Sequence, residues 1–243
     1  MMQTITRFSE VTFFDANTAW EQWNLTEYTF KSECLRSVCR NLEETQPSLS
    51  AVMNFHLQQA DERLSEPKLM PGPTGETNEL YTAGRGVCAL VVEPSMPWVA
   101  VMAPLTAALI AGNAVLICSD DKELNQCLES AISSVLPAHL VHIVAYDAYQ
   151  AVIEADIRMA AFVGSAKTQR SINADLAQKK GAIVPFIAET IAAENTQDRC
   201  DSLSLVQAHD PSLVLRFITE RTRTINITAV GGNATLLELG NQH

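Results

Sequence analysis

Residues 85–119 hold the pattern that most constrains the fold of this chain. Two short apolar runs, residues 87–92 and 114–117, flank a longer apolar segment at residues 98–111. Short, continuous apolar runs are typical of strands that are buried on both faces, as in a parallel sheet. Gly112 then supplies the left-handed residue that commonly ends a helix. The pattern predicts a strand–helix–strand unit.

The chain after this unit repeats the alternation of strands and helices. Further strands are expected at residues 141–145, 159–163 and 182–188, and further helices at residues 120–135, 147–154 and 166–178. Strands that alternate with helices favour parallel pairing. We therefore expect an α/β fold, a doubly wound, Rossmann-like parallel sheet of about five strands.

An N-terminal helical arm is expected before the sheet. Its helices are predicted at residues 27–42 and 48–64, with a shorter helix ahead of them. Thr26 is the expected N-cap of the first of these, and Asp15 or Asn17 that of the shorter helix. Residues 65–80 contain three prolines and two glycines, so they predict a connector.

These patterns divide the chain into three parts. Residues 1–80 form the helical arm and connector, residues 81–190 the Rossmann-like dinucleotide fold, and residues 191–243 a tail. Residues 220–240 alternate like β structure and predict a terminal hairpin. A polar hairpin is only marginally stable by itself. We therefore expect it to pair with another sheet, with a sheet of a partner chain as one option.

Six residues are the candidates for that contact. They are Arg221, Arg223, Ile225, Ile227, Gly231 and Gly232, the last two at the predicted turn. Arg221 and Arg223 are expected on the same side of the hairpin. They either pair with acidic residues of a partner or keep a strand edge soluble.

Charge and cysteine content exclude some classes of function. The chain carries 28 acidic against 17 basic residues, a net charge of -11, and such a surface repels nucleic acid. Its six cysteines include no C-x-x-C pair, which favours a reducing, cytoplasmic location. Residues 98–111 are shorter than the roughly 20 residues of a membrane span. His139 and His142 straddle a strand start, so we expect them to point apart and hold no metal.

Five short motifs, in order between residues 19 and 190, resemble the aldehyde dehydrogenase superfamily. They are Ala19-Trp20, Arg85-Gly86-Val87 with the turn at residues 94–98, Ala111-Gly112-Asn113-Ala114-Val115, Phe162-Val163-Gly164-Ser165 and the segment PFIAET at residues 185–190. The resemblance implies the dinucleotide fold inferred above. It also implies a chemistry based on a cysteine nucleophile, a glutamate base and NAD.

Two further segments resemble the C-terminal part of the bifunctional proline utilization A proteins. They are PGPTGETN at residues 71–78 and the predicted hairpin at residues 220–240. Those proteins oxidise proline to glutamate with FAD-dependent and NAD-dependent sites, and their long forms end in an extra aldehyde-dehydrogenase-like domain. The resemblance implies that catalytic domains of such a parent protein, or another copy of this chain, bind the hairpin. Whether the chain is a fragment or stands alone stays open.

The catalytic residues implied by the resemblance have two candidates. Glu189 corresponds to the glutamate base, but the Gly-Gly pair that follows this glutamate in the family is absent. Cys200 lies only eleven positions later, and the flanking Asp198 and Asp201 would raise the pKa of its thiol. We therefore expect no working catalytic site.

The cofactor residues implied by the resemblance are also depleted. Cys118 stands where the family has a lysine that pairs with the adenosine ribose, and Asp121 where it often has a ribose-binding glutamate. Gly164 and Ser165 either offer a helix N-terminus to a phosphate or simply cap that helix. We expect no cofactor in this chain, with NAD as the alternative.

Three functions therefore compete. The favoured one is a non-catalytic domain that stabilises the semialdehyde dehydrogenase site of a proline-catabolism enzyme and helps channel its pyrroline-5-carboxylate intermediate. The second is a reduced NAD-dependent aldehyde dehydrogenase that uses Cys200 and Glu189. The third is an NAD-sensing module that depends on Asp121, Gly164 and Ser165.

Overall fold

The central strand–helix–strand unit consists of β3 (Val87–Val92), α4 (Trp98–Ile110) and β4 (Ala114–Cys118). Every residue of these three elements is buried. The computed structural model describes residues 8–72, 75–191 and 206–226. Gly112, with a φ of 97°, makes the left-handed turn between helix and strand, as the sequence predicts.

Three more strands complete a five-stranded parallel sheet in the order β5-β4-β3-β6-β7. They are β5 (Val141–Val144), β6 (Met159–Gly164) and β7 (Phe186–Thr190). The predicted fold class is confirmed, but the prediction for the last strand is wrong by several residues. Its pairing with β6 begins at Phe186 opposite Ala160, so the apolar residues before it stay in the loop, where Ile183 is 94% exposed.

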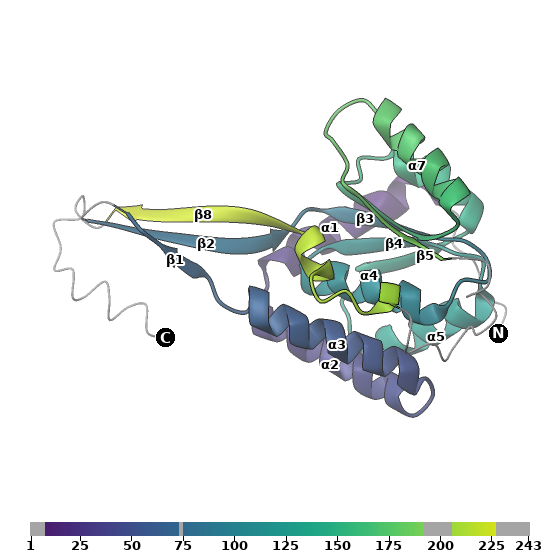
Figure 1. Ribbon diagram of the computed structural model, residues 1–243, viewed down its shortest axis with the longest axis horizontal. Helices are drawn as coiled ribbons and strands as arrows, with labels where there is room; N and C mark the ends of the chain where they lie inside the picture. The colour runs from purple at the N-terminus through teal and green to yellow at the C-terminus, as the bar shows by residue number, and fades with distance from the viewer. Residues whose placement is uncertain (1–7, 73–74, 192–205, 227–243) are drawn as a thin grey trace.

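Helices cover both faces of this sheet (Figure 1). One face packs against α2 (Tyr28–Glu43), α3 (Pro47–Leu64), α4 and α5 (Lys122–Ile132). The other packs against α1 (Glu10–Leu25), α6 (Tyr149–Glu154) and α7 (Ala166–Gln178). Successive β3 residues alternate between the two cores: Leu90 belongs to the first, and Ala89 and Val91 to the second. Among the described helices, none is both long and apolar enough to cross a membrane.

The N-terminal arm forms as predicted in α2 and α3, but its expected caps are wrong. Ser9 caps α1 by accepting the amide hydrogen of Thr12, so Asp15 and Asn17 lie inside the helix. The Thr26 hydroxyl donates to the carbonyl of Trp23 and so closes α1 instead of starting α2. Trp23 anchors the arm, because its buried indole donates to the carbonyl of Leu109 at 2.8 Å.

The predicted connector is instead part of a second sheet. β1 (Lys68–Met70), β2 (Glu76–Gly84) and β8 (Ile218–Asn226) form an antiparallel ribbon in the order β1-β2-β8. The ribbon projects from the body of the molecule (Figure 1). β8 is the first arm of the predicted hairpin, and it pairs along its whole length with β2 of the same chain. The turn predicted at Gly231 and Gly232 lies outside the described residues.

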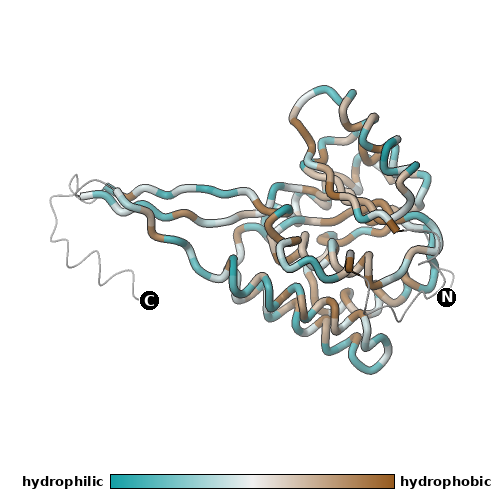
Figure 2. The backbone as a smooth tube through the Cα atoms, viewed as in Figure 1, coloured by the Kyte–Doolittle hydropathy of each residue, from teal (hydrophilic) through white to brown (hydrophobic). Residues whose placement is uncertain are grey.

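Three short 3-10 turns complete the described elements. They are η1 (Tyr146–Ala148), η3 (Val206–Ala208) and η4 (Leu213–Arg216). The buried residues Leu213 and Val214 of η4 hold the tail against the body. The hydropathy colouring in Figure 2 shows that apolar segments concentrate in the body, whereas the ribbon is largely pale or hydrophilic.

Candidate functional site

The carboxyl ends of the parallel strands meet at one edge of the sheet. β3 lies between β4 and β6, so the chain order reverses there, and ligands of open α/β sheets bind in the crevice outside such a point. Glu93 follows β3, Asp121 follows β4 and Ser165 follows β6. The fold therefore brings the predicted cofactor candidates to a single edge, together with one residue that the sequence analysis did not single out.

That additional residue is Glu93, whose carboxylate lies at the start of α7. Its Oε2 accepts the amide hydrogen of Ser165 at 2.5 Å, and its Oε1 accepts hydrogen bonds from the hydroxyls of Ser165, at 3.2 Å, and Thr168. The Glu93 amide donates to Val163, which continues the pairing of β3 with β6 and fixes the position of the side chain. An acidic residue directly after a buried strand is the signal that would have identified it.

Gly164 lies directly beneath this carboxylate. A Cβ atom at this position would be 2.5 Å from Glu93 Oε2 and 2.5 Å from the ring of Phe162, so a larger residue would require these side chains to move. Ser165, the next residue, caps α7 because its hydroxyl accepts the amide hydrogen of Thr168. Gly164 and Ser165 thus both contact the protein's own carboxylate.

Asp121 and Cys118 lie at the adjoining end of β4. Asp121 caps α5, since its Oδ1 accepts the amide hydrogens of Glu123 and Leu124, and its Oδ2 accepts the indole hydrogen of Trp98 at 3.0 Å. Cys118 is fully buried, and burial raises the pKa of its thiol to about 12. With Glu93 at the start of α7, the residues present do not fit the phosphates of a bound dinucleotide.

Glu189 lies in β7 opposite Val163, so β6 separates it from Glu93. Its side chain is 14% exposed, and Arg216 approaches its carboxylate at 3.5 Å. Burial raises the pKa of Glu189, and the guanidinium of Arg216 acts in the opposite direction. Glu189 is therefore a partly buried carboxylate, and its raised pKa is a property of a general base.

Four of the five cysteines in the described part of the chain do not suit the role of a nucleophile for that base. Burial raises the pKa of Cys34, Cys39 and Cys88, as it does for Cys118. Such thiols are protonated at neutral pH and react slowly. Cys200, the predicted candidate, lies outside the described residues.

His139, just before β5, and His142, within β5, do not point apart, which corrects the sequence prediction. His139 Nδ1 lies 3.2 Å from His142 Nε2, because a positive φ of 66° at His139 turns its ring back toward the strand. Asp15 Oδ2 is 4.0 Å from His139 Nδ1. Within the described part of the chain, no group of three or more His, Cys, Asp or Glu residues is arranged to hold a metal ion.

The predicted interaction residues lie on the ribbon, as far as the structure describes them. Arg223 pairs with Glu79 of β2, which stands directly opposite, and the Thr224 hydroxyl donates to Asn78 Oδ1 at 2.6 Å. The acidic residue that Arg223 pairs with in this structure therefore belongs to the same chain. Arg221 and Ile225 are exposed on β8, and Ile227 lies outside the described residues.

Asn113 fixes the root of the ribbon to the body. Its Oδ1 accepts the amide hydrogens of Arg85 and Gly86, which follow β2, and its Nδ2 donates to the carbonyls of Ala108 and Phe217, the latter just before β8. Asn113 is fully buried. Sequence analysis identified it only as part of a motif, because its partners come from distant parts of the chain.

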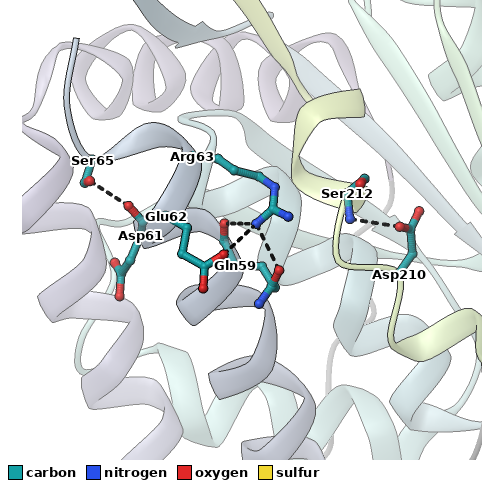
Figure 3. A network of polar contacts seen from close by, with 7 residues as sticks. All are labelled: Gln59, Asp61, Glu62, Arg63, Ser65, Asp210 and Ser212. Carbon is teal, nitrogen blue, oxygen red and sulfur yellow. Dashed lines mark hydrogen bonds and ion pairs between the residues drawn. The ribbon is translucent and has the colours of Figure 1, made fainter. Parts of the chain in front are cut away.

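A cavity of about 490 Å³ lies beside this root, between the ribbon and the ends of α2 and α3. Burial lowers the pKa of Lys31 on its wall to about 8, and the ammonium donates to the carbonyl of Thr26. Figure 3 shows Arg63, another lining residue, held against its own helix by Gln59 and Glu62. Leu25, at 84% exposure, adds an apolar surface to this cavity.

Comparison with known protein families identifies the family of this chain. The model of the aldehyde dehydrogenase family matches residues 47–192, more than half of the chain. The chain belongs to the aldehyde dehydrogenase family. This confirms the resemblance read from its motifs, and the match includes the whole parallel sheet and ends before Cys200.

Solved structures with this fold agree with the family assignment. A bifunctional proline utilization A (PutA) protein is 23% identical with a TM-score of 0.65, and the match covers 78% of this chain and 22% of that one. For PutA from Bdellovibrio bacteriovorus, inactivated by N-propargylglycine, identity is 15%, the TM-score 0.65 and coverage 74% and 22%. PnpE in complex with nicotinamide adenine dinucleotide is 19% identical with a TM-score of 0.62, and the match covers 73% of this chain and 42% of that one.

These relatives are much longer than the region they share with this chain. The chain spans 22% of the PutA proteins and 42% of PnpE. No curated protein matches the chain. At these identities the likeness to solved structures establishes the aldehyde dehydrogenase fold.

Proposed function

We propose that this chain is a non-catalytic domain of an aldehyde-dehydrogenase-type protein, and that its ribbon docks onto a catalytic aldehyde dehydrogenase domain. The observation that carries the proposal is β8. Seven of its nine residues are exposed, and it forms the outer strand of the ribbon among the described strands. A long, exposed outer strand is a template for pairing with another sheet.

The sheet edge supports the non-catalytic part of the proposal. The donors at the start of α7 bind Glu93, and a buried thiol, Cys118, stands in place of the ribose-binding lysine. Cys34, Cys39, Cys88 and Cys118, four of the five described thiols, have raised pKa values, which argues against a thiolate nucleophile at those positions. We infer that this chain binds no cofactor and transfers no hydride.

The likeness to PutA proteins supports a place in proline catabolism. Solved neighbours include a bifunctional PutA and a PutA with proline bound in remote sites. In such a protein, FAD and NAD would belong to the catalytic domains, and the ribbon of this domain would cover the semialdehyde dehydrogenase site. It would thereby help retain pyrroline-5-carboxylate between the two active sites. We also propose that the protein is cytoplasmic.

Two truncations test the docking role. A chain ending at Asn226 keeps β8, and a chain ending at Thr219 removes nearly all of it. Calorimetric titration of each into the aldehyde dehydrogenase region of a PutA protein should show binding only when β8 is present. Light scattering on each chain alone reveals whether a second copy is bound instead. Binding that survives the loss of β8 would contradict the proposal.

Glu189 favours a second candidate, a reduced NAD-dependent aldehyde dehydrogenase. Its raised pKa and partial burial are properties of a general base. If Cys200 acts with it, the chain should reduce NAD in the presence of glutamate semialdehyde, and Cys200→Ala should abolish that rate. The proposed non-catalytic role predicts no NADH formation by either protein and no effect of Cys200→Ala on a parent enzyme.

A further inference from the structure

We propose that Glu93 is an internal substitute for a cofactor phosphate, and that this one side chain closes the dinucleotide site at the switch point of the sheet. In the aldehyde-dehydrogenase-like sheet of this chain, the start of α7 is the position that offers donors to a dinucleotide pyrophosphate. The ligand excluded is therefore a nucleoside diphosphate or dinucleotide. Removal of the carboxylate should admit it.

The hydrogen bonds of Glu93 match those that a phosphate would make. A main-chain amide at a helix start and two hydroxyls, from Ser165 and Thr168, converge on its two oxygens. Phosphate and carboxylate use the same donors at such a position, since both are anions with acceptor oxygens. The carboxylate also repels a second anion at this short range. Donor occupancy and charge therefore act together against a dinucleotide.

Gly164 provides a second observation of the same carboxylate. The Glu93 carboxylate occupies the space next to its Cα so closely that a methyl group would collide with it at 2.5 Å. In dinucleotide-binding folds, glycine at such a turn allows the backbone to approach the pyrophosphate. Here the same close approach is made by Glu93 instead.

A substitution series tests the proposal on the full chain. Glu93→Ala removes the side chain, Glu93→Gln keeps its shape without the charge, and Glu154→Ala removes an exposed carboxylate elsewhere on the surface. NAD, ADP and inorganic pyrophosphate are titrated into each protein by calorimetry. We expect Glu93→Ala to bind NAD and ADP at least tenfold more tightly than the unmodified chain and Glu154→Ala. Glu93→Gln should fall between them, because its carbonyl still occupies the Ser165 amide.

Two results would overturn the proposal. One is binding of NAD by the unmodified chain with the same affinity as by Glu93→Ala. The other is no gain for either Glu93 variant when circular dichroism shows that at least Glu93→Gln is folded. The proposed docking role is judged separately by the β8 truncations, because the ribbon does not include Glu93.

Discussion

The parallel sheet and the ribbon use their strands in opposite ways. All six residues of β3 are buried between two helical layers, whereas seven of the nine residues of β8 are exposed. The sheet is held by apolar packing, and the ribbon by main-chain pairing and polar contacts such as Arg223 with Glu79. A strand with so little buried apolar surface gains stability mainly from what it pairs with. The apolar surface that the body buries can therefore stabilise its fold, and the ribbon is the part suited to bind a partner.

The largest effect that this comparison predicts is at the centre of the sheet. Leu90→Ala in β3 should lower the free energy of unfolding by about 2–5 kcal/mol, because it removes a side chain that is only 1% exposed and leaves a cavity. Denaturant unfolding measures the loss. Ile225→Ala in β8, where the side chain is 37% exposed, is the matched control and should cost under about 0.5 kcal/mol. Equal losses would refute the distinction between the two regions.

The body of the molecule was readable from sequence for the same reason that Leu90→Ala is expected to be costly. Continuous apolar runs such as residues 87–92 form strands only when both faces are covered, so pattern and burial agree. The strand β2 lacks that signal: its residues are partly exposed, and prolines precede it. Its pairing partner, β8, lies far along the chain, and the local sequence around β2 does not predict this pairing.

The sheet edge was only partly readable. Motif likeness identified Gly164 and Ser165, but their contact with Glu93 depends on the pairing of β3 with β6, which places residues 72 positions apart in contact. The four hydrogen bonds of Asn113 are hidden in the same way. In both cases one polar side chain bonds to several groups, most of them far away in the sequence, and a linear pattern does not report that.

The second prediction concerns the junction between the two regions. Asn113→Ala leaves the amides of Arg85 and Gly86 and the carbonyl of Phe217 without their partner, which should cost about 2–4 kcal/mol. Hydrogen exchange should accelerate along β2 and β8 first. Asn125→Ala removes another buried asparagine, one that bonds to Ser119 at the sheet edge, and should leave exchange in the ribbon unchanged.

A smaller effect is expected from His56, which ties the tail to α3. Its ring bonds to the carbonyl of Ala208 at 2.9 Å, and burial lowers its pKa, with His209 acting in the same direction and Asp210 against it. The unfolded chain takes up this proton below pH of about 6.5, before the folded protein does. Stability should therefore be unaffected by His56 above that pH and should fall below it, by at most about 1.4 kcal/mol per pH unit.

Denaturant unfolding between pH 5 and 8 checks this, with His56→Gln as the control. Glutamine keeps a hydrogen-bond donor for Ala208 but does not titrate. Glu189, whose pKa is raised, alters stability in this range in both proteins, so the difference between their curves isolates His56. A parallel pair of curves would show that the tail contact does not depend on the protonation of this ring.

The smallest effect should come from the most visible contact of the ribbon. Arg223→Ala removes an ion pair in which the arginine side chain is 61% exposed, and the gain from such pairs is offset by side-chain entropy and screened by salt. Thermal unfolding of the variant should match that of the unmodified chain at both low and high salt, with Glu79→Gln as the reciprocal control. A loss as large as that of Asn113→Ala would mean that the ribbon folds as an integral part of the body. An unchanged thermal unfolding midpoint combined with weaker binding to a catalytic domain would instead show that the Arg223–Glu79 pair stabilises the docking surface. The reason is that only a bound ribbon excludes the water that screens this pair.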